Sequence, residues 1–187
     1  MRRTTSAVSG LVVLAFVAGW YVGHSGTAGR RALPLPAGAS VESCFSPGGG
    51  CTAVIVAALN DARQWVRVQA YSFTSAPIAQ ALVEAHRRGV STEIILDKSQ
   101  VSERYSAADF TSRAGIATFI DAEHAIAHNK VIILDGSTVI TGSFNFTKAA
   151  EERNAENVLI LRDQPELAAQ YLSNYETHRE HSQPYAR

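Results

Sequence analysis

The chain has 187 residues, of which 46% are hydrophobic and 18% are charged, and its formal net charge at pH 7 is zero. This length and apolar content fit one domain with a buried core and exclude an intrinsically disordered protein. Removal of residues 1–28, which carry Arg2 and Arg3, would change the net charge to −2, so bulk charge does not indicate a nucleic-acid binder. Any affinity for phosphate must therefore come from local clusters of side chains.

Residues 1–28 have the pattern of an export signal. Two arginines precede an uncharged apolar run over residues 7–22, and small residues follow, with a possible cleavage site after Ala28. The apolar run is short for a membrane span, but Trp20 and Tyr21 suit a membrane interface, so residues 7–22 could instead remain as a membrane tether. Both alternatives predict a periplasmic or secreted protein.

The rest of the chain is predicted to contain a linker, residues 29–40, and one domain, residues 41–187. Patterns of strands and helices alternate along this domain. The predicted strands are residues 41–45, 65–73, 92–96, 117–120, 131–134, 138–141 and 157–161. The predicted helices are residues 52–63, the stretch between Ser75 and Gly89, and residues 105–114 and 166–181. The alternation predicts a mixed, largely parallel sheet flanked by helices on both faces.

Cys44 and Cys51 flank a Pro- and Gly-containing loop and are the two cysteines of the chain. Their even number, their close spacing and an oxidising compartment predict one disulfide. Free thiols are the alternative, and a zinc site is disfavoured because no second cysteine pair exists. The Gly48–Gly50 run lacks the Lys-Ser/Thr of a nucleotide-binding loop, so it is interpreted as a turn closed by the disulfide.

Residues 128–145, HNKVIILDGSTVITGSFN, carry the candidate active-site side chains on a predicted hairpin. His128 and Lys130 are two apart and share one face of an extended strand, as do Ser143 and Asn145. Asp135 has the opposite parity, which favours a supporting role such as ordering the Asp-Gly turn. The motif therefore predicts a site at the ends of neighbouring strands.

These residue types suit reaction at a phosphodiester. The imidazole of His128 can attack phosphorus, and Lys130 can place a positive charge beside a phosphate oxygen. Ser143, Asn145 and backbone N–H groups can donate hydrogen bonds to the other phosphate oxygens. None of these roles requires a metal or another cofactor, so the sequence predicts chemistry without either.

The spacing HxK, four residues, D, six residues, GSxN resembles the signature of the phospholipase D superfamily. The resemblance extends through the segments VQAYSFTSAPIAQAL and EIILDKSQ, and so covers most of the chain after residue 41. It implies a sheet of the kind described above and a phosphohistidine intermediate at His128, with Lys130, Ser143 and Asn145 binding phosphate. It also implies that Glu156 hydrogen-bonds the His128 ring and fixes its tautomer.

Enzymes of this superfamily use two such motifs, and this chain contains one. The sequence is therefore similar to the small, single-motif Nuc-type bacterial endonucleases, which assemble one site from two identical chains. This resemblance implies a homodimer that acts on DNA or RNA with little sequence specificity. A phospholipase D-type lipid phosphodiesterase and a non-catalytic nucleic-acid-binding module are the two alternatives.

A different grouping of histidines would predict a metal site. His124 and His128 are four apart and lie near Asp121 and Glu123, but an HxxxH pair needs a helix, and residues 129–134 have a strand pattern. No metal site is predicted for this reason, and His124 is assigned to the surface or the substrate groove. Ser143 as nucleophile is also disfavoured, because Asn145 replaces the second glycine of a G-x-S-x-G turn. The remaining domain histidines are predicted to be solvated helix residues: His86, His178 and His181.

Overall fold

The structure is a computed structural model that describes residues 35–186. The predicted signal peptide or tether, residues 1–28, and residues 29–34 of the predicted linker lie outside the described residues. Within the described part, no helix has both the length and the apolar character needed to cross a membrane.

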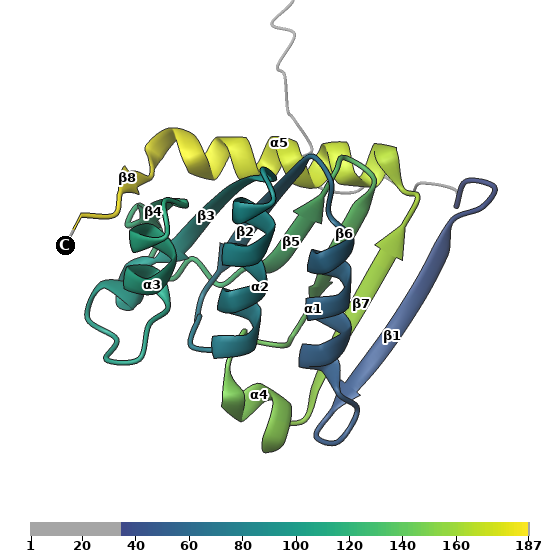
Figure 1. The fold of residues 1–187 in the computed structure, drawn as a ribbon, viewed down its shortest axis with the longest axis horizontal. Coiled ribbons are helices and arrows are strands. Elements are labelled where there is room, and N and C mark those ends of the chain that lie inside the picture. Colours follow the sequence, from purple (N-terminus) through teal and green to yellow (C-terminus); the bar gives the residue numbers. More distant parts are fainter. Residues whose placement is uncertain (1–34, 187) are drawn as a thin grey trace, which may run out of the picture. The chain divides into compact units, whose positions relative to one another are not determined.

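The described residues form one eight-stranded sheet with the strand order β1-β7-β6-β5-β2-β3-β4-β8 (Figure 1). The strands are β1 (Ser40–Ser46), β2 (Trp65–Ala70), β3 (Ser91–Asp97), β4 (Ala117–Asp121), β5 (Lys130–Leu134), β6 (Thr138–Gly142), β7 (Glu156–Arg162) and β8 (Gln183–Pro184). The predicted mixed sheet is confirmed.

The prediction that this sheet is largely parallel is wrong. Only β2–β3 and β3–β4 are parallel, and the five other neighbouring pairs are antiparallel. Parallel neighbours need a long crossover, and both parallel pairs have one that contains helix. The tight turn between β5 and β6 instead forces antiparallel pairing, and β1 joins the sheet beside β7 rather than beside β2.

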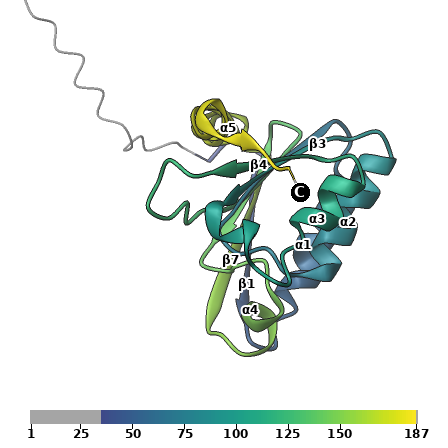
Figure 2. The same ribbon diagram turned by 90° about the vertical axis from the view of Figure 1, so that its left-hand side faces the viewer.

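Helices cover both faces of the sheet, as predicted (Figure 2). One face packs against α1 (Cys51–Asp61), α2 (Ala76–Arg87) and α3 (Ala108–Arg113), and the other packs against α5 (Pro165–His181). The fully buried strand β5 serves both cores, since Ile132 belongs to the first and Ile133 to the second. Alternating side chains of one apolar run therefore hold two helical layers.

Several short elements were not predicted. They are the 3₁₀ helix η1 (Lys98–Val101), helix α4 (Lys148–Glu152) and strand β8. The predicted strand 65–73 ends at Ala70. The Tyr71 N–H still donates to the Asn129 carbonyl, but the Phe73 N–H donates to the Gln100 side chain. These connections leave the sheet and shape the region beside His128.

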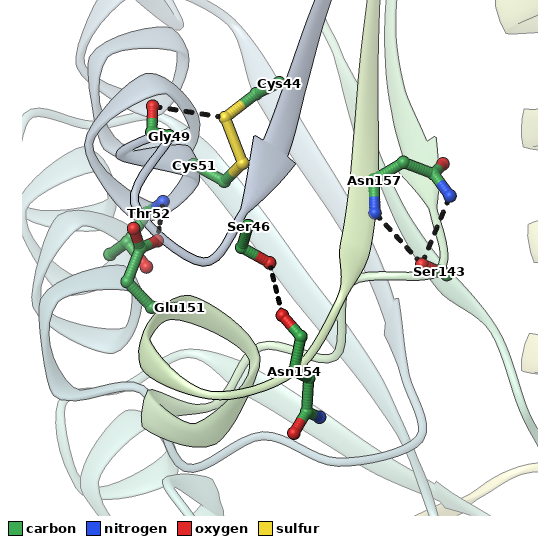
Figure 3. Close-up of a disulfide and its surroundings, with 9 residues drawn as sticks. All are labelled: Cys44, Ser46, Gly49, Cys51, Thr52, Ser143, Glu151, Asn154 and Asn157. Atoms are coloured by element: carbon green, nitrogen blue, oxygen red, sulfur yellow. Dashed lines mark hydrogen bonds between the residues drawn. A yellow bond between two sulfur atoms is a disulfide. The ribbon is translucent and has the colours of Figure 1, made fainter.

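The predicted disulfide between Cys44 and Cys51 is present and joins the end of β1 to the first residue of α1 (Figure 3). The Cα atoms are 5.6 Å apart, and both cysteines are buried in the larger core. The two cysteines are seven positions apart in the sequence, so the bridge closes a short loop at one end of the sheet.

We expect reduction of this bridge, or a Cys44→Ser/Cys51→Ser double substitution, to lower the free energy of unfolding by about 2 kcal/mol, because a short closed loop restricts the unfolded chain. Denaturant unfolding measures this loss. Non-reducing mass spectrometry of exported protein should also show a mass two hydrogens below that of the reduced chain. Two thiols that react with an alkylating agent in freshly exported protein would contradict the disulfide.

Candidate active site

All of the predicted site residues except Asp135 lie at one edge of the sheet, the lower edge beside α4 in Figure 1. Antiparallel pairing places the start of β5 beside the end of β6, and the end of β6 beside the start of β7. Lys130 is the first residue of β5, Gly142 is the last of β6, and Glu156 is the first of β7. His128 and Ser143 lie just beyond two of these strand ends.

His128 is exposed and lies at the end of the connection from β4 to β5. Its ring centroid is 4.6 Å from that of Tyr71, and the Tyr71 N–H donates to the Asn129 carbonyl at 2.9 Å. The preceding residue is also fixed, because the Ala127 N–H donates to the buried Asp97 carboxylate at 2.7 Å. The imidazole therefore faces solvent from a tightly held backbone.

Lys130 is buried, with 7% of its surface exposed. Its Nζ donates to the His128 carbonyl at 2.8 Å and lies 5.1 Å from the centroid of the Tyr71 ring. Burial lowers the pKa of Lys130, and the negative charge of Glu156 opposes part of this effect. The ammonium group is thus a poorly solvated cation next to His128, and it would gain from an anion brought to this edge.

Gly142 and Ser143 are fixed by the start of β7. A Cβ atom on residue 142 would lie 2.2 Å from the Asn157 carbonyl oxygen, so this position requires glycine. The N–H groups of Ser143 and Phe144 both donate to that carbonyl, at 3.1 and 3.3 Å. The Ser143 Oγ in turn accepts from the Asn157 backbone N–H at 3.0 Å and from its Nδ2 at 3.3 Å (Figure 3). Because both contacts use the oxygen as acceptor, the hydroxyl proton stays available for a ligand.

Asn145 lies between Phe144 and Phe146, two of the largest fully buried side chains. Within residues 35–186, the buried Asn145 Oδ1 has no hydrogen-bond partner. A buried polar atom without a partner is costly, and such atoms mark places where a ligand or another chain completes the structure. The backbone on both sides of Asn145 is held, because the Phe144 N–H donates to the Asn157 carbonyl and the Phe146 N–H donates to the Ser72 carbonyl.

Glu156 is half-buried, and its Oε1 accepts a hydrogen bond from Asn154 Nδ2 at 3.1 Å. The hydrogen bond from the His128 ring to Glu156 that the family resemblance implies is not made in the described part of the chain. Tyr71 is instead the side chain that packs on this ring. Glu156 contributes here through its charge near Lys130.

Asp135 lies at the opposite end of β5 from His128. Its carboxylate accepts hydrogen bonds from the backbone N–H groups of Arg63, Gln64 and Trp65, at 2.8 to 2.9 Å. Its φ of 51° and that of Gly136, 71°, fit the tight hairpin turn that the Asp-Gly pair predicts. Asp135 therefore ties the entry of β2 to the β5–β6 turn, and the structure does not bring it to the other site residues.

Three residues at this edge were missed by the sequence analysis: Tyr71, Asp97 and Asn157. The only available signal was their position at strand ends, within or beside segments that resemble the superfamily. Their roles depend on contacts between distant parts of the chain, and such contacts are not visible in a local pattern.

Comparison with known proteins places this arrangement in a family. The family described as "Cardiolipin synthase, PLD-like domain" matches residues 55–179. A phospholipase D of Rickettsia conorii is 48% identical over 135 residues, which cover 72% of this chain and 67% of that protein. A mitochondrial cardiolipin hydrolase of Mus musculus is 31% identical over 147 residues, which cover 78% of this chain and 66% of the relative.

Solved structures agree with this placement. The phospholipase D family member Nuc from Salmonella typhimurium matches with a TM-score of 0.77 and 38% identity, over 80% of this chain and 99% of that one. NucT from Helicobacter pylori matches with a TM-score of 0.69 at 23% identity, over 78% of this chain and 100% of that one, and so supports the fold alone. With its one HxK…D…GSxN motif, the chain belongs to the phospholipase D superfamily as a single-motif phosphodiesterase.

Proposed function

We propose that this phosphodiesterase hydrolyses nucleic acid, with little sequence specificity and without a metal, through a phosphohistidine at His128. The observation that carries the proposal is the combination of an exposed imidazole with a buried ammonium group and two polar side chains at one sheet edge. Lys130, Ser143 and Asn145 would bind the non-bridging phosphate oxygens, and their charge and dipoles would stabilise the additional negative charge of the transition state.

The reaction divides into two displacements at phosphorus. In the first, a neutral imidazole nitrogen of His128 forms a P–N bond while the P–O bond to the leaving group breaks. An acid on the opposite side protonates the leaving oxygen. In the second, that group accepts a proton from water as the water oxygen attacks phosphorus. The P–N bond then breaks, and its electron pair returns to the imidazole, which leaves neutral.

A second copy of the chain would supply the acid. Among residues 35–186, the other histidines make their contacts elsewhere: His86 is on α2, and His124, His178 and His181 surround the Asp121 carboxylate. Two copies of His128 that face each other across a two-fold axis can fill both roles. They must hold different protonation states, because one imidazolium raises the free energy of forming a second beside it.

Two features of the structure and one comparison favour a nucleic-acid substrate. His128 and Ser143 are exposed at an open edge, which a long polymer can cross. Phe45 is 65% exposed and lies opposite Asn157 in the β1–β7 register, where its ring could stack on a base. The match to the Salmonella typhimurium Nuc structure spans almost all of that chain.

A lipid phosphodiester is the second candidate substrate. Its support is the identity to a phospholipase D of Rickettsia conorii, together with Ile126, an apolar residue that is 55% exposed two positions before His128. An acyl chain could contact such a residue. Both substrates present the same phosphodiester to the same side chains.

The disulfide indicates an oxidising compartment. We propose that the protein acts in the periplasm or outside the cell, where residues 1–28 would serve as a cleaved signal or residues 7–22 as a membrane tether.

The substrate and the metal requirement can be tested together. Purified protein in excess EDTA should cleave plasmid, single-stranded DNA and RNA, and should leave phospholipid vesicles intact. The substitution His128→Ala should lower kcat by about 10⁴-fold or more, because it removes the nucleophile. His86→Ala is the matched control, and its kcat should stay within about twofold of the wild type.

Three outcomes of this assay would contradict parts of the proposal. A complete loss of cleavage in EDTA that added divalent metal restores would contradict the metal-free reaction. Hydrolysis of vesicles with nucleic acid left intact would favour the lipid substrate. Binding of nucleic acid without turnover would indicate a non-catalytic module.

The shared site makes a quantitative prediction for mixed dimers. Wild-type and His128→Ala chains, unfolded together in equal amounts and refolded, give dimers of which about one quarter keep both histidines. Because each site would need both, activity should fall to about one quarter of that of an all-wild-type sample. Activity near one half would mean that each chain carries an independent site. A mixture of wild-type and His86→Ala chains should keep full activity.

A further inference from the structure

A second cluster of polar side chains lies where the C-terminal end of α5 meets β4 (Figure 1). Asp121 is the last residue of β4, His124 is in the connection that follows, and His178 and His181 are in the last turns of α5. One possible ligand atom from each residue can be chosen so that all four lie within 4.8 Å of one another. The three imidazole rings have centroid separations of 4.8 to 5.4 Å.

The centre of this cluster is the buried carboxylate of Asp121. Its Oδ2 lies 2.7 Å from His178 Nδ1, 3.2 Å from His124 Nδ1 and 3.3 Å from His181 Nε2. Within residues 35–186, its ion pairs are with these histidines and not with lysine or arginine. A fully buried carboxylate needs a compensating positive charge, and neutral imidazoles do not supply one.

The hydrogen bonds of the cluster are incomplete. His181 Nε2 is buried and, despite its distance of 3.3 Å from Asp121 Oδ2, forms no hydrogen bond of acceptable geometry in the described part of the chain. Three ring nitrogens thus converge on one oxygen, which cannot accept good hydrogen bonds from all of them. This convergence is the arrangement expected of ligands around a cation.

The distances from Asp121 Oδ2 are close to those of tetrahedral coordination, and any larger separation within the 4.8 Å set would have to shorten when a cation binds. With metal–ligand bonds of about 2.0–2.1 Å, neighbouring ligand atoms in a tetrahedron are about 3.3–3.4 Å apart. The His124–Asp121 and His181–Asp121 separations are close to this value, and the His178–Asp121 pair would need to open by about 0.6 Å. Because His178 and His181 are three apart on a helix, both rings project from one face of α5.

We propose that Asp121, His124, His178 and His181 form a structural binding site for a borderline transition-metal dication, with Zn²⁺ as the best match. Three imidazoles and one carboxylate suit Zn²⁺, whereas Mg²⁺ and Ca²⁺ prefer sites made of oxygen ligands. Four protein ligands fill a tetrahedral shell, so the site would be closed to substrate. Its function would be to join α5 to the connection between β4 and β5.

That connection leads directly to His128. Besides the proposed metal site, Lys98 Nζ donates to the His124 carbonyl at 2.8 Å, and Asp97 holds the N–H of Ala127. A cation at Asp121 and His124 would thus fix one end of the segment whose other end carries the proposed nucleophile. His124, His178 and His181 would be positioning residues without contact to the substrate.

The competing explanation is a hydrogen-bonded charge cluster without a metal. The Asp121 carboxylate has hydrogen-bond contacts with His178 and His124, so a proton on one of these rings could also compensate its buried charge. A direct binding measurement separates the two.

The test uses purified protein without a polyhistidine tag, dialysed against chelator and then into metal-free buffer. Calorimetric titration with Zn²⁺ should show one ion bound per chain, and Co²⁺ should give the intense visible absorption of tetrahedral coordination. The double substitution His178→Ala/His181→Ala should weaken Zn²⁺ binding at least 100-fold and remove the Co²⁺ spectrum. Zn²⁺ should raise the Tm of the wild type and not that of the double variant.

Two further variants guard against a folding defect. His181→Gln keeps a polar side chain of similar size and should keep the fold, as judged by circular dichroism, yet lose the Co²⁺ spectrum. His86→Ala removes a histidine from the opposite face of the sheet and should bind Zn²⁺ as the wild type does. The absence of Zn²⁺ binding by the wild type, or equal binding by the wild type and the double variant, would overturn the metal site.

The same variants distinguish a structural metal at this site from a metal that takes part in the reaction. If removal of the structural cation loosens His128, EDTA should reduce wild-type activity only to that of the His178→Ala/His181→Ala variant, whose own activity should not respond to EDTA. A metal acting on the phosphate would leave the double variant sensitive to EDTA.

Discussion

Antiparallel pairing of β5, β6 and β7 is the constraint on which the active-site edge depends. It brings residues that are up to 28 positions apart, from His128 to Glu156, to neighbouring strand ends. Gly142 makes the closest approach possible, because any side chain there would collide with the Asn157 carbonyl. Asp135 maintains the far end of the same hairpin through hydrogen bonds to the entry of β2. The strand register, held at both ends of the β5–β6 hairpin, thus fixes the distance between the proposed nucleophile and the phosphate-binding groups.

The same edge contains groups that oppose stability. Lys130 is buried with a lowered pKa, and the Asn145 Oδ1 is buried without a partner in residues 35–186. An anionic phosphate would stabilise the ammonium group of Lys130 through its negative charge, whereas the Asn145 Oδ1 needs a hydrogen-bond donor from a ligand or another chain. The fold thus holds these groups in place before the substrate binds, and this preorganisation lowers the stability of the folded chain.

Much of this arrangement could be predicted from local sequence. The β5–β6 hairpin, the disulfide and the helices on both faces follow from short-range patterns, and the structure confirms them. Strand direction was predicted wrongly, because alternating strand and helix patterns do not reveal that β5, β6 and β7 lie between β1 and β2.

Contacts between distant segments explain the remaining differences. His178 and His181 were predicted to be solvated, but their side chains are 13% and 27% exposed and lie against Asp121, 57 positions before His178. The sequence analysis excluded a metal site with His124 and His128 because the strand pattern of residues 129–134 does not allow a helical HxxxH pair. No local pattern indicated possible ligands on α5. The packing of Tyr71 on His128 has the same long-range origin.

The stereochemical course at phosphorus distinguishes a covalent intermediate at His128 from direct attack by water. Each in-line displacement inverts phosphorus, so two displacements through His128 restore the original configuration. Cleavage of a dinucleotide with a chiral phosphorothioate linkage in ¹⁸O-labelled water therefore distinguishes the two pathways. A phosphohistidine intermediate predicts net retention of configuration in the product. Net inversion would mean direct attack by water and would contradict a phosphohistidine at His128.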